Sequence, residues 1–325
     1  MTRRGFVLGK FMPPHAGHVW LCRTARAMVD ELTILVCWLP GDPVDGGQRL
    51  GWMRELFPDC RVIGHGDPIP QAPEEHPDFW PLWIDAIRRV HPEPVDYVFA
   101  GEVYGLELAR RLGAQFIPVM RGDFPGGRSL SGTAVREDRF GQWRWLPAPV
   151  KRDWALRICL HGVESTGKSV LTPKLAAHFD TVMVPEYGRY HCEVHGLDFD
   201  ASGLMTIGRV QQAMIDAAAP EANRLLIADT DALMTAAWHE MLFGPAPAEL
   251  LNYRKADLYL LFDADVPWVD DGTRFFGTDG ERGRFAALCR DMLDRCGVNY
   301  CLISGDWAAR EQAAVAAINA LLSDR

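Results

Sequence analysis

The sequence lacks an apolar run long enough to cross a membrane. Its strongest apolar stretch, from Leu32 to Leu39, has the length of a strand, whereas a membrane-spanning helix needs about 18 residues or more. The apolar stretch that follows the two arginines near the amino terminus is also too short for a secretory signal peptide. We therefore expect a cytoplasmic protein that is not embedded in a membrane.

An excess of positive charge is also absent. The chain has 34 lysines and arginines against 43 aspartates and glutamates, which gives a formal net charge of −9. Affinity for duplex nucleic acid and for anionic membrane surfaces grows with the number of basic side chains. We therefore expect no nucleic-acid partner. The net charge does not exclude small anionic ligands, because a few local cations are enough to bind them.

Closely paired cysteines are missing. The eight cysteines are scattered and include no Cys-x-x-Cys pair, the spacing that zinc sites and many redox motifs use. Scattered, unpaired cysteines are ordinary in cytosolic proteins, where thiols stay reduced. We predict reduced, mostly buried thiols and assign no metal site to them.

What is present is the composition of an ordinary globular protein. The 325 residues are 48% hydrophobic and 24% charged, and this length favours two domains. Strand-like runs, many of them continuously apolar, alternate with helical patterns in one series from residue 5 to 120 and in a second from 156 to 304. Continuously apolar strands are typical of parallel sheets that are buried on both faces. The sequence therefore predicts an α/β fold with two tandem parallel-sheet domains.

A break in the alternation of strand-like and helical segments marks the boundary between these domains. Two prolines and a charge cluster interrupt it at 146–153, before a fresh strand begins. We therefore predict one domain at 1–148 and a second at 153–325.

A first candidate site follows the first strand, where the chain reads G-K-F-M-P-P-H-A-G-H from Gly9 to His18. A Gly- and Pro-rich turn that leads into a helix start favours phosphate binding. His15 and His18 fall on one face of the first helical turn and can stabilise charge on a transferring nucleotidyl group. A single loop histidine is more often structural, but six specified positions in ten residues favour function.

A second segment, at 131–136, also has residues that suit phosphate binding. Ser131, Thr133 and Arg136 place two hydroxyls and a guanidinium at a helix start, where they can clamp a triphosphate. Taken alone, this segment is more simply an ordinary N-cap. Its occurrence together with the first motif makes the clamp the better interpretation.

The two segments resemble the signatures of the nucleotidyltransferase superfamily with the HxGH motif. The resemblance implies a Rossmann-like domain in which a substrate phosphate attacks the α-phosphorus of ATP and releases pyrophosphate. Lys10, His15, His18 and Arg136 would be catalytic. The implied ATP contacts are Gly9, Phe11, His18, Ser131, Thr133 and Arg136.

The second half of the chain carries a phosphate-binding loop. The pattern G-x-x-x-x-G-K-S runs from Gly162 to Ser169, directly after a strand and directly before a helix. Backbone amides of such a loop cradle phosphates, the lysine reaches the transferring group and the serine hydroxyl binds Mg²⁺. We predict a P-loop kinase in which Lys168 is catalytic. The predicted ATP contacts are Gly162, Glu164, Ser165, Thr166, Gly167, Lys168 and Ser169.

Carboxylates follow two of the predicted strands in this half. Glu186 comes after the strand at 181–185, and Asp229 and Asp231 come at the end of the strand at 225–229. Parallel sheets bind ligands at the carboxyl ends of their strands. We predict that Glu186 acts as base or positions the acceptor and that Asp229 binds Mg²⁺ with Ser169, although the two roles could be exchanged.

Several residues are weaker candidates for substrate contact. Aromatic and charged side chains can contact a substrate by stacking and by charge, and a solvated loop or a core edge is an equally good interpretation of each. In the first half these residues are Trp80, Trp83 and Asp85. In the second half they are Tyr187, Arg189, Asp231, Trp268 and the loop arginine Arg274.

The two sites together resemble the NadR-like family of bifunctional NMN adenylyltransferases and ribosylnicotinamide kinases. The resemblance covers nearly the whole chain and includes, besides the motifs above, Arg49, Trp52 to Arg54, Glu102, Tyr104 to Ala109, Trp143 and Val184 to Arg189. It implies that the second domain phosphorylates nicotinamide riboside with ATP and Mg²⁺ to give NMN. The first domain would then join NMN to AMP, giving NAD and pyrophosphate.

Two expectations depend on this resemblance, and two alternatives to it stay open. Some members carry an amino-terminal helix-turn-helix, whereas the first motif here begins at Gly9, so we expect no transcriptional repression. Homo-oligomers are common in the family. The alternatives are the same two chemistries on other substrates, such as pantetheine phosphate or a sugar phosphate, and a sensor that binds ATP and NAD without turnover.

Overall fold

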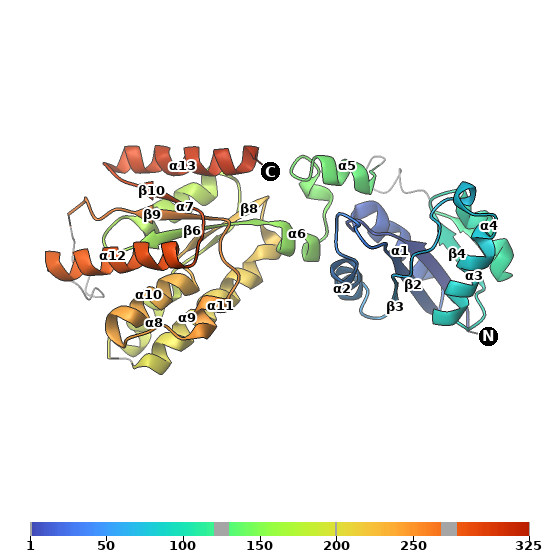
Figure 1. Cartoon of the computed structure of the whole chain (residues 1–325), viewed down its shortest axis with the longest axis horizontal. Helices are drawn as coiled ribbons and strands as arrows, with labels where there is room; N and C mark the ends of the chain where they lie inside the picture. The colour runs from blue at the N-terminus through green and yellow to red at the C-terminus, as the bar shows by residue number, and fades with distance from the viewer. Residues whose placement is uncertain (1, 120–129, 199, 268–277, 325) are drawn as a thin grey trace. The chain divides into compact units, whose positions relative to one another are not determined.

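The computed structural model describes residues 2–119, 130–198, 200–267 and 278–324. The chain divides into two compact units, Met1–Val150 and Lys151–Arg325, and the short helix α6 (Ala148–Trp154) contains the boundary. Each unit is described below by itself (Figure 1).

The first unit is a five-stranded sheet in which all neighbouring strands are parallel, in the order β3-β2-β1-β4-β5. The strands are β1 (Arg4–Gly9), β2 (Glu31–Cys37), β3 (Arg61–His65), β4 (Tyr97–Ala100) and β5 (Gln115–Pro118). The helices are α1 (Ala16–Met28), α2 (Gly46–Leu56), α3 (Phe79–Val90), α4 (Tyr104–Leu112) and α5 (Gly132–Glu137).

Helices cover both faces of this sheet. Adjacent residues of β1 point to opposite faces, so Val7 packs with α1 and α2 while Phe6 packs with α3 and α4. Burial on both faces is the reason that β2 reads as a continuous apolar run rather than an alternating one. The order of the strands reverses at β1, and ligands of such sheets bind beside the carboxyl end of the strand at this switch point.

The second unit is also a fully parallel sheet, in the order β10-β9-β6-β8-β7. The strands are β6 (Leu156–Gly162), β7 (Met183–Val184), β8 (Leu225–Asp229), β9 (Leu258–Phe262) and β10 (Tyr300–Ile303). The helices are α7 (Lys168–His178), α8 (Tyr187–His195), α9 (Ala201–Ala218), α10 (Ala232–Leu242), α11 (Ala248–Asn252), α12 (Asp279–Arg295) and α13 (Trp307–Ser323). β6 lies at the centre and is buried along its whole length.

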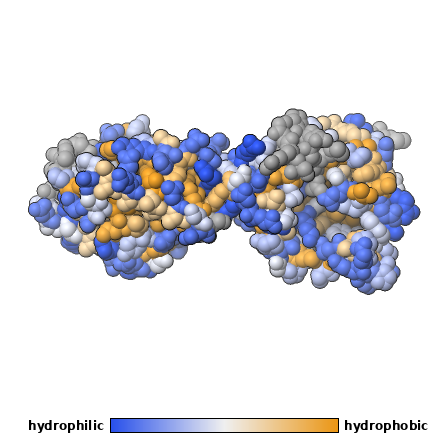
Figure 2. Space-filling view, turned by 90° about the horizontal axis from the view of Figure 1, so that it is seen from above, coloured by the Kyte–Doolittle hydropathy of each residue, from blue (hydrophilic) through white to orange (hydrophobic). Residues whose placement is uncertain are grey.

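The described helices do not include a candidate membrane span. Within the described ranges, no helix is long and apolar enough to cross a membrane. On the face seen in Figure 2, hydrophobic residues lie among hydrophilic ones.

A buried histidine in β6 makes the stability of the second unit sensitive to acid. His161 is fully buried, its Nε2 lies 3.2 Å from the carbonyl oxygen of Cys289, and burial, with the nearby charge of Lys168, lowers its pKa to about 3. The unfolded chain binds a proton at this ring below about pH 6.5, whereas the folded chain does not.

We therefore predict that His161 does not affect the free energy of unfolding of this unit above pH 6.5, and that its contribution lowers this free energy by ~1.4 kcal/mol per pH unit between about pH 6.5 and pH 3. Urea unfolding at pH 7.5 and 5.5 tests this prediction. Lowering the pH from 7.5 to 5.5 should destabilise the unaltered chain by ~1.4 kcal/mol relative to His161→Leu, whereas His178→Leu, at an exposed position, should follow the unaltered chain. Equal slopes in the unaltered chain and in His161→Leu would contradict it.

Candidate active sites

The loop after β1 places two histidines side by side. β1 ends at Gly9, and His15 is the N-cap residue of α1. The rings of His15 and His18 are both buried, with their centroids 3.8 Å apart, and Phe11 packs edge-on against His18 at 5.1 Å. This pair lies at the amino end of a helix, where the partial positive charge favours phosphate.

The second motif of the first unit lies against the first. Arg136 Nη1 donates to the carbonyl oxygen of Met12 at 2.6 Å, and Nη2 donates to Thr133 Oγ1 at 3.1 Å. A Cβ atom on Gly132 would lie 2.6 Å from the same Met12 oxygen, so only glycine allows this approach. Ser131 caps α5 by accepting a hydrogen bond from the backbone N–H of Ala134. The structure therefore brings together segments that are more than a hundred residues apart.

Arg49 is a buried residue of this site that has no predicted role. Its guanidinium donates to the carbonyl oxygens of Lys10 (2.8 Å) and Cys37 (3.3 Å) and pairs with Asp42 at 2.7 Å. These bonds fix the loop between β1 and α1 to the end of β2. In the sequence, Arg49 is noted among the residues that carry the family resemblance, with no role given to it.

The tryptophans of α3 belong to the core or its edge. Trp83 is buried, and its indole N–H donates to the carbonyl oxygen of Pro70 at 2.8 Å. Trp80 packs beneath the guanidinium of Arg111, 5.4 Å from the ring centroid, and Asp85 is exposed. Lys10, in the first loop, is exposed as well.

The P-loop of the second unit has a well-defined conformation between β6 and α7. Gly167 has a φ of +86°, which glycine adopts without strain. Lys168 Nζ donates to the carbonyl oxygens of Gly162 and Val163 at 2.8 Å, and Thr166 Oγ1 donates to the carbonyl oxygen of Val163 at 2.8 Å. The loop thus wraps around the lysine ammonium group, which is buried.

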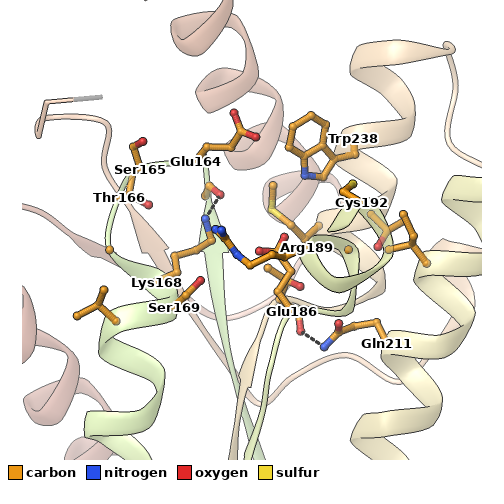
Figure 3. A pocket seen from close by; sticks show the side chains of 18 of the residues that line it. Glu164, Ser165, Thr166, Lys168, Ser169, Glu186, Arg189, Cys192, Gln211 and Trp238 are labelled. Atoms are coloured by element: carbon orange, nitrogen blue, oxygen red, sulfur yellow. Dashed lines mark hydrogen bonds between the residues drawn. The ribbon is translucent and has the colours of Figure 1, made fainter. Parts of the chain in front are cut away.

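A cavity of about 340 Å³ opens beside this loop. Figure 3 shows Lys168, Glu186 and Arg189 converging in it, with Trp238 and Cys192 on the opposite wall. The whole predicted loop lines the cavity except Val163, and α8, α9 and α10 supply most of the other residues. Val170 of α7, Glu186 before α8 and Thr230 before α10 complete the lining. A cavity of this size holds a small ligand.

Two carboxylates of this unit have raised pKa values. Burial and the neighbouring charge of Asp229 raise the pKa of Glu186 to about 7, although Lys168 and Arg189 oppose the shift. Burial likewise raises the pKa of Asp229, against the effects of Lys168 and of a hydrogen bond with Ser169. Such a pair of interacting carboxylates at a cavity is a frequent property of catalytic sites.

The oxygen atoms at Asp229 fit a magnesium ion. Asp229 Oδ1 is buried and has no hydrogen-bond partner among the described residues, and the Ser169 hydroxyl is next to this carboxylate. Mg²⁺ prefers carboxylate, hydroxyl, water and phosphate oxygens. The described ranges contain no cluster of three or more His, Cys, Asp or Glu side chains that could hold a metal ion. Phosphate oxygens of the nucleotide would therefore have to complete the coordination shell of Mg²⁺.

Asp231 and the remaining candidates lie elsewhere. Asp231 caps α10 by accepting from the backbone N–H of Leu233 and Met234, and it accepts from the Tyr259 hydroxyl at 2.6 Å. Its carboxylate is thus used within the protein and does not line the cavity. The ring of Tyr187 packs against His191. Trp268 and Arg274 lie outside the described residues.

Gln211 on α9 connects the two carboxylate-bearing segments. Its Oε1 accepts from the backbone N–H of Tyr187 at 2.7 Å, and its Nε2 donates to the carbonyl oxygens of Pro185 (3.2 Å) and Thr230 (3.3 Å). One buried amide therefore fixes the residues on both sides of Glu186 and the residue after Asp229. The sequence offers no motif for it beyond a buried helical position.

We predict that Gln211→Leu destabilises the second unit by about 1–3 kcal/mol, because it leaves one buried and two partly buried backbone groups without their partner. Urea unfolding of the full chain measures the change. Gln312→Leu, at an exposed position of α13 in the same unit, should cost less than about 0.5 kcal/mol. An equal effect of the two substitutions would show that the amide does not support these segments.

Comparison with known proteins extends over both units. A family model described as an AAA domain matches residues 157–310. The trifunctional NAD biosynthesis/regulator protein NadR of Escherichia coli (strain K12) is 29% identical over 322 residues, which are 91% of this chain and 77% of that protein. The nicotinamide-nucleotide adenylyltransferase of Methanoculleus marisnigri is 27% identical over 168 residues, 50% of this chain and 94% of that protein.

Solved structures show the same fold. The structure described as NadR protein in complex with NR has a TM-score of 0.76 at 19% identity and covers 98% of this chain and 96% of that chain. A second, described as NadR protein in complex with NAD and AMP-PNP, has a TM-score of 0.74 at the same identity. The predicted pair of parallel-sheet α/β domains and the resemblance stated from the motifs are confirmed.

Proposed function

The chain is NadR-like over nine-tenths of its length, and we propose that it is a bifunctional enzyme of NAD synthesis. The second unit phosphorylates nicotinamide riboside with ATP to NMN, and the first unit joins NMN to the AMP part of ATP, giving NAD and pyrophosphate. The observation that carries this proposal is the presence, in one chain, of a paired-histidine phosphate site and a P-loop cavity that contains a carboxylate with a pKa of about 7.

In the first unit, the chemistry needs charge stabilisation rather than a base. An oxygen of the NMN phosphate, already an anion, forms a bond to the α-phosphorus of ATP while the bond to the β-phosphate oxygen breaks. His15 and His18 lie where they can donate to the α-phosphate as its charge grows. Ser131, Thr133 and Arg136 are the proposed contacts of the departing pyrophosphate, a role supported by the contacts of Arg136 with Thr133 and with Met12 in the loop of the histidines.

In the second unit, a hydroxyl must lose its proton. The oxygen of the riboside 5′-hydroxyl forms a bond to the γ-phosphorus of ATP, the bond to the β-phosphate oxygen breaks, and ADP leaves. Glu186 faces the cavity and is the proposed proton acceptor, because a pKa of about 7 suits proton transfer near neutral pH. Lys168 and Arg189 neutralise the charge on the phosphates.

Ser169 and Asp229 would hold the magnesium ion, which supplies charge neutralisation on the phosphates of ATP. The hydrogen bond between these two residues and the orphaned Asp229 Oδ1 favour this assignment over the exchange of roles with Glu186. ATP and Mg²⁺ are therefore the proposed cosubstrate and metal of the kinase.

The wall opposite the P-loop suits an aromatic ring. Trp238 lines the cavity together with the apolar side chains of Leu204, Ile207 and Met234. An indole attracts a cation held over its face, and the nicotinamide ring of the riboside is a cation. Trp238 is thus the proposed aromatic contact of the kinase, and it was not among the tryptophans singled out from the sequence.

A product assay tests the proposal. Purified protein is incubated with nicotinamide riboside, ATP and Mg²⁺, and NMN, NAD, ADP and pyrophosphate are separated by chromatography. We expect NAD with equimolar ADP and pyrophosphate. NMN without NAD would reject the assignment of the first unit, and neither product would reject the substrate in favour of acceptors such as pantetheine phosphate.

We predict that variants separate the two activities. Lys168→Ala should lower riboside-dependent ADP formation at least about 100-fold and leave NMN-dependent pyrophosphate release intact, because each reaction loses only the charge at its own site. His18→Ala should do the reverse. Lys174→Ala and His76→Ala, at exposed positions, are matched controls. Full activity in Lys168→Ala or in His18→Ala would refute the site concerned.

We also predict a pH dependence of the kinase. Glu186 accepts a proton only when ionised, and its pKa in the free protein is about 7. The kcat/KM for the riboside should therefore fall roughly tenfold per pH unit below pH 7 and level off above it. Glu186→Gln should lower kcat by about 100-fold or more and abolish this limb of the profile. An unchanged profile in that variant would assign the titration to another group.

A further inference from the structure

Three glycines of the first unit surround one tryptophan. Trp38 is the first residue after β2, and its backbone N–H donates to the carbonyl oxygen of His65 at 3.0 Å. A Cβ atom on Gly46 would lie 2.2 Å from Cγ of the indole, one on Gly66 would lie 2.4 Å from Nε1, and one on Gly64 would lie 2.5 Å from Cη2. These contacts run from the base of the ring to its far end, so the backbone encloses the indole along its length.

Space, and not backbone conformation, requires glycine at these positions. None of the three glycines has a positive φ, so the backbone conformation itself would admit other residues. In each case the atoms nearest to the added Cβ belong to Trp38. Gly64 lies within β3, although glycine is unfavourable inside a strand. The indole is therefore the feature that excludes a larger residue from all three positions.

The enclosed ring connects the end of β3 to the start of α2. Gly46 is the first residue of α2, whereas Gly64 is in β3 and Gly66 directly follows it. A tryptophan side chain has only two rotatable bonds, and here it has backbone on both sides. The ring cannot move without displacing one of these two elements, so it fixes the position of the first turn of α2 relative to β3.

Arg49 lies one turn along α2 from this contact. It follows Gly46 by three residues, is fully buried, and donates to the carbonyl oxygens of Lys10 (2.8 Å) and Cys37 (3.3 Å). A buried guanidinium is costly unless its hydrogen bonds are made, and these bonds weaken steeply when the geometry is poor. A displacement of the start of α2 would therefore reach the Lys10 carbonyl, in the loop that leads to the paired histidines.

We propose that Trp38 is a positioning residue for adenylyl transfer, which acts through α2 and Arg49 on the loop of the paired histidines; this inference rests on the proposed reaction of the first unit. Trp38 needs no contact with a substrate for this role. The histidines stabilise charge on the α-phosphate only where they are correctly placed, and a displacement of about 1 Å can lower a rate about 100-fold.

Kinetics of the full chain test this role. NMN-dependent pyrophosphate release is measured for Trp38→Ala, Trp38→Phe, Arg49→Met and the double variant Trp38→Ala/Arg49→Met. Trp20→Ala removes a tryptophan of α1 that is 37% exposed and is the matched control.

We expect Trp38→Ala to lower kcat about 10- to 100-fold, Trp38→Phe to retain part of the activity, and Trp20→Ala to match the unaltered chain. The double variant should be no slower than Arg49→Met, because both residues act on the same loop by one route. An unchanged kcat in Trp38→Ala, or losses that multiply in the double variant, would overturn the proposal. A role in stability alone would not produce this dependence on Arg49.

Hydrogen exchange tests the enclosure of the ring without any reaction. Gly64→Ala should speed deuterium uptake in the peptide that contains residues 10–18, because the added methyl group displaces the indole. The same substitution should add nothing in Trp38→Ala, where the ring is gone, and uptake at 97–112 should stay unchanged in all variants.

An equal effect of Gly64→Ala with and without the indole would overturn the enclosure and the proposal with it. Trp38→Phe replaces Trp38→Ala in both comparisons if the alanine variant does not fold. Absence of NMN-dependent pyrophosphate release in the unaltered chain would overturn only the proposed adenylyl transfer, because the exchange measurement still decides whether Trp38 positions the loop.

Discussion

Both candidate sites depend on one constraint of the backbone. In each unit the central parallel strand ends at the carboxyl edge of the sheet, and the chain turns within a few residues into a helix, from β1 to α1 and from β6 to α7. The first backbone N–H groups of a helix have no partner within it and carry the positive end of its dipole. A central strand also has neighbours on both sides, so the loops after those strands meet at the same edge. Phosphate binding and the convergence of side chains thus follow from a single topological feature.

The loops at these edges are held by buried polar side chains that take no part in the chemistry. Arg49 holds the loop between β1 and α1, Gln211 holds the segments of Glu186 and Asp229, and Arg310 holds the P-loop against α13. A buried guanidinium or amide is costly unless its hydrogen bonds are made. These residues therefore favour the one loop conformation that satisfies them, and the sites are shaped before any ligand arrives.

The interpretation of carboxylates and tryptophans from sequence shows where local patterns stop being informative. Glu186, Asp229 and Asp231 all follow apolar strands, yet Glu186 faces the cavity, Asp229 is buried beside Ser169, and Asp231 caps the next helix. An acidic residue between a strand and a helix looks the same in all three cases, because aspartate is also a favoured N-cap. The tryptophans show the same ambiguity. Trp83 packs in the core, whereas Trp238 lines the cavity, and both lie on helices whose other apolar side chains are largely buried.

The sequence by itself determined the alternation of strands and helices, the two phosphate-binding motifs and the resemblance that joins them. These are local properties, because continuous apolar runs, glycines in tight turns and residues at fixed spacing act within a few positions of the chain. Only the tertiary structure decided which distant residues meet. Arg136 reaches the Met12 carbonyl across 124 residues, and Arg310 reaches the Thr166 carbonyl across 144. Such contacts depend on the order of strands in a sheet and on which face of a helix is buried, and neither is encoded in a short window of sequence.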